Sequence, residues 1–410
     1  MSETVPNFGF YKGNHYAQHR DIRIMSAFQP IYSIAHRRIV GLEGLARGID
    51  SNANSVAPAQ LFTAQKSEDI IQLDYLCQRV HLDNFYALNP PNAWLFLNID
   101  PYTLSDKDRH IEFLSTLVKQ GNHQENQIVI EILESMIDDE SELENCIQQY
   151  KDLGFLIAID DFGAGQSNFE RIWRIKPDIV KLDRGMLQKA GIDPSVRSLI
   201  KGVTNMLHNC KCIVLAEGVE TQEEAIVAMD SGVDLVQGFY FAHPFLLSES
   251  IPARPGLWKD LYQNFDELSL LSNARYSQIL STYIDKFTEA TEKENANLQT
   301  MADILLKEQR TIRLYQLSLD GEQCFSNINS TTICIPTKDR LSALADAQGA
   351  SWKRREYFSN AVNNPGFIQA TKPYFSIADG TLCITLSLQL EIENTQFIVC
   401  CDVLWEDSNY

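Results

Sequence analysis

The stretch LIAIDD, residues 156–161, is the segment that decides the fold. Its four consecutive apolar residues predict a strand buried on both faces, which is typical of a parallel sheet. The run ends on two adjacent carboxylates, Asp160 and Asp161. The segment therefore predicts a buried strand that delivers acidic side chains to the edge of a sheet or the mouth of a barrel.

The same pattern recurs on both sides of this segment, between residues 25 and 245. Segments 58–85 and 141–154 space their apolar residues at three and four, as amphipathic helices do. With FQPIYSI as the first strand, about eight strands fit, so the alternation predicts an α/β protein with a (β/α)₈ TIM-like barrel. The other runs with their polar ends are IVGLE at Glu43, WLFLN at Asn98, IVIE at Glu131, IVKLD around Lys181, VLAE at Glu217 and LVQG at Gln237.

Polar residues at the ends of barrel strands gather around one mouth, where such enzymes place their active sites. A polar residue can also end a strand for solubility alone, which would account for one or two of these positions. It does not account for five carboxylates, two amides and a lysine directed at one small volume. We therefore expect the strand ends to form a single site.

Carboxylates crowded together repel one another unless they share protons or a cation. An all-oxygen set of Asp, Glu and Asn side chains suits Mg²⁺ or Mn²⁺. The neighbours Asp160 and Asp161 should project to different sides of their strand, which leaves room for a bridged pair of metals. Lys181 and Arg47 add positive charge for a phosphate group. These residues alone leave open a divalent-metal hydrolase or an isomerase, in either case with a phosphorylated substrate.

The composition sets further limits. A chain of 410 residues, 44% hydrophobic and 22% charged, is long enough for a barrel and a second globular domain. A net charge of −19 argues against a partner such as long nucleic acid. Neither a signal-peptide core nor an apolar window of about 18 residues occurs, so we expect a cytoplasmic protein without a membrane span. The nine cysteines lack a disulfide or zinc framework and are expected to be reduced thiols.

Seven segments together resemble the successive motifs of EAL domains, the bacterial phosphodiesterases that linearise cyclic di-GMP. The resemblance covers residues 22–247, with the motifs in the family's order and with its separations. It implies hydrolysis to linear pGpG with Mg²⁺ or Mn²⁺, two ions in each active site. The segments are FQPIYSIAHRRIVGLEGLAR, FLNID, VIEILES, IAIDDFGAGQSNF, PDIVKLD, VLAEGVET and VQGFYFAHP.

The resemblance also assigns roles by motif. Lys181 and Glu217 correspond to the pair that positions or deprotonates the attacking water, and Glu43 is the signature glutamate with a catalytic role. Glu134 and Glu220 correspond to glutamates that support the metal site or anchor a loop, although either could instead lie on a solvated helix face. The metal ligands would be Glu43, Asn98, Glu131, Asp160 and, for the second ion, Asp161. The substrate contacts would be Gln29, Arg47 and Gln237, with Arg47 on a phosphate.

Two departures from the family pattern bear on activity. Gly44 stands where the signature usually has alanine, which we expect to loosen the strand slightly. Ala164 and Gln166 replace the commoner threonine and tyrosine in the loop that resembles the one linking dimer contacts to the metal site, so a lower rate is expected.

The C-terminal part of the sequence indicates a different architecture. We expect the barrel to occupy residues 1–250, a linker and long helix residues 251–312, and a smaller α+β domain residues 313–410. The helix, with apolar residues at helical spacing from 264 to 312, could pack on the barrel or form a dimer seam. The last segment resembles PAS/Cache-type sensor domains and is expected to be regulatory. The residues that could line a small-anion pocket there, or could instead be core aromatics and surface arginines, are Trp352, Arg354, Arg355, Tyr357 and Tyr374.

The expected function is therefore cyclic di-GMP hydrolysis in a homodimer, with an unknown small ligand in the C-terminal domain. A receptor that binds cyclic di-GMP without cleaving it is the main alternative, because many EAL domains have lost catalysis. Receptors typically lack one or more metal ligands, and this chain keeps the whole set. A metal-dependent sugar-phosphate isomerase is the third hypothesis.

Overall fold

The computed structural model describes residues 7–62, 67–121, 124–133, 140–165, 169–249, 254–293, 297–333, 344, 346–392 and 395–405. The chain forms two compact units, Met1–Glu267 and Leu268–Tyr410, and the division between them falls within one helix. The domain boundaries expected at residues 250 and 312 stay a prediction. No helix in the described part of the chain combines the length and hydropathy needed to cross a membrane.

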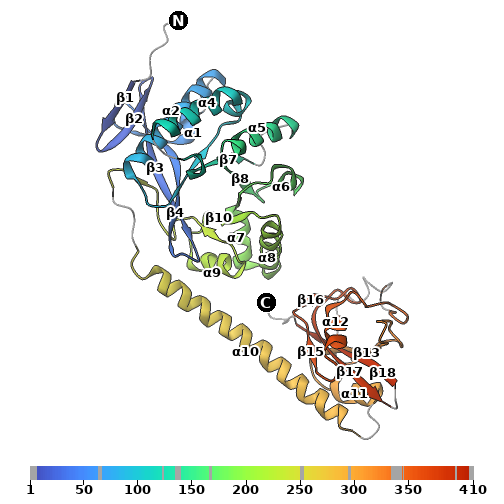
Figure 1. Ribbon diagram of the computed structural model, residues 1–410. Helices are drawn as coiled ribbons and strands as arrows, with labels where there is room; N and C mark the ends of the chain where they lie inside the picture. The colour runs from blue at the N-terminus through green and yellow to red at the C-terminus, as the bar shows by residue number, and fades with distance from the viewer. Residues whose placement is uncertain are drawn as a thin grey trace. The chain divides into compact units, whose positions relative to one another are not determined.

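The first unit contains a closed barrel of eight strands (Figure 1). Their order around the barrel is β3-β11-β10-β9-β8-β7-β6-β4, and pairing of β3 with β4 closes the ring. The expected α/β barrel is thus confirmed. The strands are β3 (Ile22–Ser33), β4 (Arg38–Ile49), β6 (Trp94–Asn98), β7 (Ile128–Leu133), β8 (Leu156–Phe162), β9 (Ile179–Leu182), β10 (Ile213–Ala216) and β11 (Leu235–Val236).

One strand departs from the regular parallel pattern. β3 runs antiparallel to both of its neighbours, β4 and β11. The connection between β3 and β4 consists of residues 34–37 only, and so short a connection joins antiparallel strands, whereas a parallel crossover needs a dozen residues or more. The first strand of the barrel therefore runs opposite to the parallel strands that follow it.

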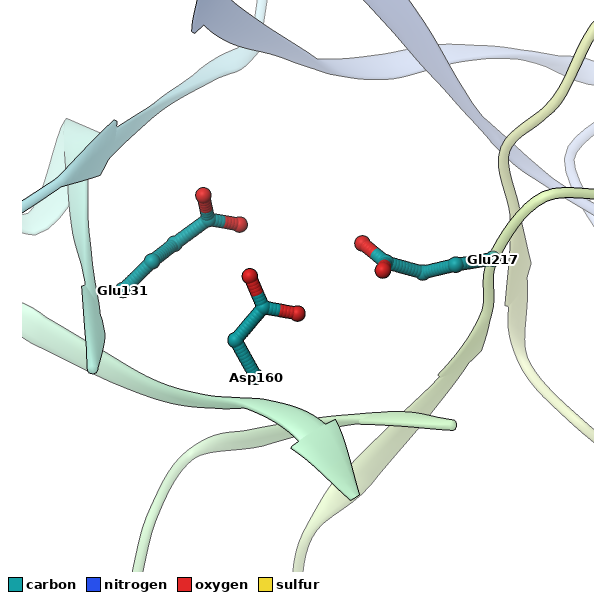
Figure 2. Close-up of side chains that lie close together, drawn as sticks. All are labelled: Glu131, Asp160 and Glu217. Carbon is teal, nitrogen blue, oxygen red and sulfur yellow. The ribbon is translucent and has the colours of Figure 1, made fainter. Parts of the chain in front are cut away.

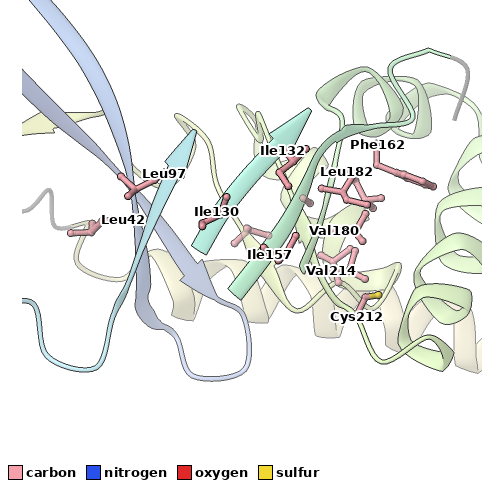
Figure 3. Packing of buried hydrophobic residues seen from close by; sticks show 14 of the residues in the cluster. Leu42, Leu97, Ile130, Ile132, Ile157, Phe162, Val180, Leu182, Cys212 and Val214 are labelled. Carbon is pink, nitrogen blue, oxygen red and sulfur yellow. The ribbon is translucent and has the colours of Figure 1, made fainter. Parts of the chain in front are cut away.

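Helices cover the outside of the barrel and bury the outward-facing residues of the strands (Figure 3). Side-chain caps start several of them: Asp183 accepts from the Gly185 amide, and Thr221 from the Glu224 amide. The helices are α1 (Pro58–Leu61), α2 (Ser67–Leu88), α3 (Pro101–Ser105), α4 (Lys107–Gln120), α5 (Glu140–Asp152), α6 (Phe169–Ile175), α7 (Arg184–Ile192), α8 (Pro194–Asn209) and α9 (Gln222–Asp230), with a 3₁₀ turn η1 at Glu125–Gln127.

The interior of the barrel holds a separate apolar layer, which fixes where the polar site must lie. Side chains alternate across a strand, so a residue two positions along projects on the same side. In the layer listed next, each buried residue has a candidate site residue two positions further along its strand. On β3, which runs antiparallel, the site residue comes two positions earlier. The layer contains Ile31, Phe96, Val129, Ala158, Ile179, Leu215 and Leu235. The polar residues therefore form the next layer, at the mouth.

Four shorter strands extend this sheet: β1 (Asn7–Tyr11), β2 (Asn14–His19), β5 (Ser55–Val56) and β12 (Phe245–Leu246). β1 and β2 form an antiparallel hairpin that continues onto β3, and β12 also pairs with β3. This long strand therefore serves both the barrel wall and the N-terminal extension.

The second unit is built on an antiparallel sheet of six strands in the order β14-β13-β18-β17-β15, with β16 beside β17. Its strands are β13 (Thr311–Leu317), β14 (Ile328–Asn329), β15 (Gln369–Ala370), β16 (Tyr374–Phe375), β17 (Leu382–Ile392) and β18 (Thr395–Leu404). The expected smaller α+β domain is confirmed in this form, while its kinship with PAS/Cache sensors stays a prediction.

Two helices replace the single long helix expected over residues 264–312. α10 extends over Leu257–Thr291 and α11 over Leu298–Leu305, while α12 (Glu356–Asn363) follows later in the chain. Asn297 caps α11 by accepting from the Thr300 amide, so a new helix starts there. The cysteines of the described residues are free thiols, most of them buried.

Candidate active site

The mouth of the barrel is organised around Lys181, whose side chain is 1% exposed. Its Nζ lies 2.5 Å from Glu131 Oε1 and 2.5 Å from Glu217 Oε1. Asp160 Oδ2 is 3.3 Å away and Glu43 Oε1 is 3.8 Å away. These five residues come from strands β4, β7, β8 and β9 and from the residue after β10. Strand ends that are far apart in sequence thus converge on one ammonium group.

Four carboxylates around one ammonium leave an excess of negative charge in a buried space. Burial alone would lower the pKa of Lys181, but the surrounding carboxylates, Glu131 and Glu217 foremost, hold it well above its usual value. Burial raises the pKa of Glu131, with Lys181 opposing the rise, and raises that of Glu217 to about 8. Lys181 is therefore charged, and the carboxylates need protons or cations to coexist.

Three of these carboxylates form a group that could hold a cation. Figure 2 shows Glu131, Asp160 and Glu217 directed toward one another, each offering an oxygen within 4.8 Å of the others. Glu131 lies close to Lys181, but neither of its buried oxygens accepts a well-oriented hydrogen bond from a described residue. Hard oxygen donors, surplus negative charge and unsatisfied acceptors together fit a divalent cation.

Glu43 is held by two side-chain amides. Asn98 Nδ2 donates to Glu43 Oε1 at 3.1 Å, and Gln237 Nε2 donates to Glu43 Oε2 at 2.6 Å. Gln237 Oε1 is buried and has no hydrogen-bond partner among the described residues. Both amides therefore fix the orientation of the Glu43 carboxylate, and amide oxygens of Asn98 and Gln237 add to the ligand capacity of the site.

A tight turn brings Gln237 to the mouth. The next residue, Gly238, has a φ of 156°, and a Cβ there would lie 2.1 Å from the Val219 carbonyl oxygen. The Gln237 carbonyl in turn accepts from the Val219 amide at 3.0 Å. Only glycine permits this approach, which keeps β11 against the loop that follows Glu217.

The two adjacent aspartates are separated by a break in the strand. The pairing of β8 with β9 shifts register between Ile159 and Phe162, and Asp161 has a φ of 56°. Asp160 is buried beside Lys181, whereas Asp161 is exposed and its amide donates to Asp160 Oδ1 at 2.8 Å. The structure thus gives the two side chains different environments. The role of Asp161 as a ligand stays a prediction.

The expected substrate contacts lie along β3 and β4. Gln29 pairs in register with Glu43, so both side chains project from the same face of the sheet. Arg47, four residues beyond Glu43 on the same strand, is half-buried and donates to the Ala46 carbonyl at 2.8 Å. Burial lowers the pKa of Arg47 while Glu43 raises it. A guanidinium and an amide therefore stand beside the carboxylate cluster.

Of the two glutamates expected to support the site, the structure describes Glu220. Glu220 Oε2 lies 2.6 Å from Arg184 Nη2, and the Glu220 amide donates to Glu224 Oε2 at 2.7 Å. It therefore ties the loop after Glu217 to the start of α7. Glu134 and Gln166 lie outside the described residues, so the predictions about them stay open.

Sequence reasoning missed the residues that support the site from behind. His81 on α2 packs beneath the signature strand, and its Nδ1 lies 2.7 Å from Ser26 Oγ. It occupies the space next to Gly44. The expected looser strand at this position stays a prediction. Asp74, also on α2, accepts from the Asp100 amide at 3.2 Å and so anchors the turn after Asn98. The one sign of His81 in the sequence was Gly44, the glycine that stands in the signature where alanine is usual.

An eight-stranded barrel with a buried lysine and oxygen donors at its mouth fits the class of barrel enzymes that work with divalent metals. The comparison with protein families is consistent with this class. Residues 16–244, more than half of the chain, match the family model of the EAL domain. The chain therefore belongs to the EAL domain family.

Individual relatives support the family assignment. The chain is 27% identical over 228 residues to the probable cyclic di-GMP phosphodiesterase PdeI of Escherichia coli, an alignment covering 54% of this chain and 29% of the relative. It is 24% identical over 318 residues to the EAL-domain containing protein YkuI of Bacillus subtilis, covering 74% and 77%. The chain thus spans under a third of PdeI but most of YkuI.

Solved structures repeat the fold. The crystal structure of Bacillus subtilis YkuI in complex with c-di-GMP and calcium has a TM-score of 0.77 at 20% identity, covering 94% of this chain and 97% of that one. A standalone EAL protein from Vibrio cholerae, bound to c-di-GMP, has a TM-score of 0.52 at 26% identity, covering 58% and 99%. Klebsiella pneumoniae BlrP1, with manganese and cyclic di-GMP, has a TM-score of 0.52 at 24% identity, covering 59% and 60%.

Proposed function

We propose that this protein hydrolyses cyclic di-GMP to linear pGpG in a reaction that depends on Mg²⁺ or Mn²⁺. The observation that carries the proposal is the Glu131–Lys181–Glu217 array, with both contacts at 2.5 Å, inside a ring of further oxygen donors. The EAL relatives with cyclic di-GMP bound in their solved structures support the choice of substrate.

The residues suited to hold the cations are Glu43, Asn98, Glu131 and Asp160, with Asp161 as a ligand of a second ion. Bound divalent ions supply a Lewis acid for the phosphate oxygens and lower the pKa of water. The protein contributes a prearranged set of carboxylates whose mutual repulsion favours loading of the site.

Lys181 and Glu217 are proposed to handle the proton of the attacking water. Glu217 can accept this proton while the neighbouring ammonium holds its carboxylate in place. The water oxygen forms a new bond to phosphorus, one P–O bond of the ring breaks, and the leaving hydroxyl takes up a proton. Cleavage of a single phosphodiester in this way opens the ring to pGpG.

Arg47 and Gln29 are proposed to bind the substrate before this step. The Arg47 guanidinium can contact a phosphate bidentately, which a lysine could not do. Because it lies on the same strand as Glu43, it would hold the phosphate next to the carboxylate cluster. Gln237 is proposed to contribute to binding through its unsatisfied carbonyl oxygen.

The variant Glu217→Gln separates an enzyme from a receptor. It keeps the side-chain volume but removes the proton acceptor, so turnover should fall by about 10²–10⁴-fold while cyclic di-GMP still binds. Turnover is measured by chromatography of the product, and binding by titration calorimetry. Wild-type protein that binds cyclic di-GMP but does not turn it over would favour the receptor alternative.

We further propose that the protein is a homodimer and that its C-terminal unit regulates the barrel. The loop changes at Ala164 and Gln166, where the family more often has threonine and tyrosine, are proposed to lower the rate. A ligand can shift an equilibrium between two arrangements only by its difference in affinity for them, typically about 1–3 kcal/mol. Light scattering and turnover of the full chain and of residues 1–250 test both points. Equal dimerisation and equal activity would count against regulation.

A further inference from the structure

The second unit contains a pocket that the proposed barrel chemistry does not use. An inner part of about 20 Å³, room for about one water molecule, lies between the sheet and the segment before α12. An outer recess of about 550 Å³ shares Trp352 and Arg355 with it as lining residues. Four of the residues singled out in the sequence line the inner part: Trp352, Arg355, Tyr357 and Tyr374.

At the bottom of this pocket Arg313 pairs with two buried carboxylates, which leaves one net negative charge there. Arg313 Nε lies 2.6 Å from Asp402 Oδ2, and Arg313 Nη1 lies 3.0 Å from Asp379 Oδ2. Asp402 Oδ1 also accepts from the hydroxyl groups of Tyr315 and Thr385, at 3.2 and 2.7 Å. These carboxylates already have donors, so they do not call for a cation from outside.

The aromatic wall is fixed in the same way. Trp352 Nε1 donates to Gln323 Oε1 at 2.9 Å, and the Gln323 amide group donates to the Phe325 carbonyl at 2.8 Å. Tyr374 and Thr385 share a hydrogen bond between their hydroxyl groups at 2.6 Å. The pocket is therefore prearranged, with its polar atoms oriented by other residues of the same unit.

Arg355 is the exception. Its guanidinium lies 5.9 Å from the Trp352 ring and 5.8 Å from the Tyr374 ring, and its side chain is only partly exposed. Within the described part of the unit, no carboxylate, carbonyl or hydroxyl oxygen pairs with it, unlike Arg313. A half-buried guanidinium held between two rings, at the wall shared by both parts of the pocket, is a binding group for an anion.

We propose that this pocket binds a small organic carboxylate, whose carboxylate group pairs with Arg355. A planar monoanion matches one guanidinium bidentately and adds a single negative charge. A doubly charged phosphate would place its second charge near the buried Asp402 and Asp379 without a cation to balance it. The apolar part of the ligand would lie in the outer recess beside Trp352.

Titration calorimetry on the full chain, with acetate and propionate as probes and sodium chloride as the ionic-strength control, tests the proposal. Both acids should give saturable binding. Arg355→Ala should weaken it by about tenfold or more, since a charged hydrogen bond is lost. The matched control Lys353→Ala, an exposed neighbour that lines neither part of the pocket, should change affinity by less than about twofold.

Two further measurements keep the outcome decisive. If circular dichroism shows that Arg355→Ala is unfolded, Arg355→Lys replaces it and should also weaken binding, because lysine lacks the bidentate geometry. Inorganic phosphate should bind about tenfold more weakly than propionate. Absence of saturable binding by both acids, unchanged affinity in the Arg355 variants, or equal binding of phosphate would overturn the proposal. None of these results depends on the activity of the barrel.

Discussion

The imidazole of His81 occupies the space that a side chain on Gly44 would need: a Cβ at position 44 would lie 2.8 Å from His81 Cγ and 3.1 Å from Cδ2. His81 is buried on α2 and shares a hydrogen bond with the Ser26 hydroxyl group. Gly44 directly follows Glu43 on β4. The glycine in the signature is therefore matched to a histidine beneath it. Support for Glu43 comes from this packing as well as from its hydrogen bonds.

This packing predicts that Gly44→Ala destabilises the barrel by about 1–3 kcal/mol, because the added methyl group must displace a buried ring. Gly202→Ala is the matched control: a Cβ there meets nothing within 4 Å, and alanine in a helix should be neutral or stabilising by up to about 1 kcal/mol. Denaturant unfolding measures both. Adding His81→Ala to Gly44→Ala should recover part of the loss, and simple additivity of the two changes would contradict the account.

The burial of His81 predicts how the stability of the fold depends on pH. Burial lowers the pKa of His81 to about 3, with the charge of Arg47 adding to the effect. Since the unfolded chain takes up this proton near pH 6.5, stability should fall as the pH decreases from about 6.5 toward 3, by at most about 1.4 kcal/mol per unit from this group. His81→Gln should make the slope of unfolding free energy against pH shallower in this window. An unchanged slope would show that His81 is not buried in its neutral form.

Metal binding should stabilise the folded barrel independently of activity. A ligand present at 100 times its dissociation constant adds about 2.7 kcal/mol to the unfolding free energy. Mn²⁺ should therefore raise the unfolding temperature by several degrees, and EDTA should reverse the change. Glu131→Gln should lose the response, whereas Glu170→Gln, a largely exposed glutamate that pairs with Arg174 on α6, should retain it. An equal rise in both variants would place the ion elsewhere.

Arg47 and Glu43 should respond differently to substitution. Arg47→Ala removes charged hydrogen bonds to substrate and should lower kcat/KM by about 10- to 100-fold, chiefly through KM. Glu43→Gln weakens the metal site and should abolish turnover. Steady-state kinetics at saturating Mn²⁺ distinguish them, with Arg38→Ala, an exposed arginine at the other end of β4, as the control. A loss of kcat alone in Arg47→Ala would remove this residue from substrate binding.

The barrel could be predicted from the sequence because its strands and helices have distinct apolar periodicities. The residues around Lys181 could be predicted because they stand at the ends of those strands. The antiparallel course of β3 was not predicted, although the short connection at residues 34–37 indicates it. His81 lay beyond prediction, since its place under Gly44 depends on how α2 packs against β4 rather than on local sequence. The charge balance around Lys181 likewise could not be predicted, because it depends on the distances between its ammonium group and four carboxylates from different strand ends.

Product analysis of cyclic di-GMP incubated with the wild-type protein tests the central claim most directly. With Mn²⁺ or Mg²⁺, ion-exchange chromatography and mass spectrometry should show conversion to pGpG, and an excess of EDTA should stop it. Intact cyclic di-GMP after prolonged incubation with saturating Mn²⁺ would contradict the account.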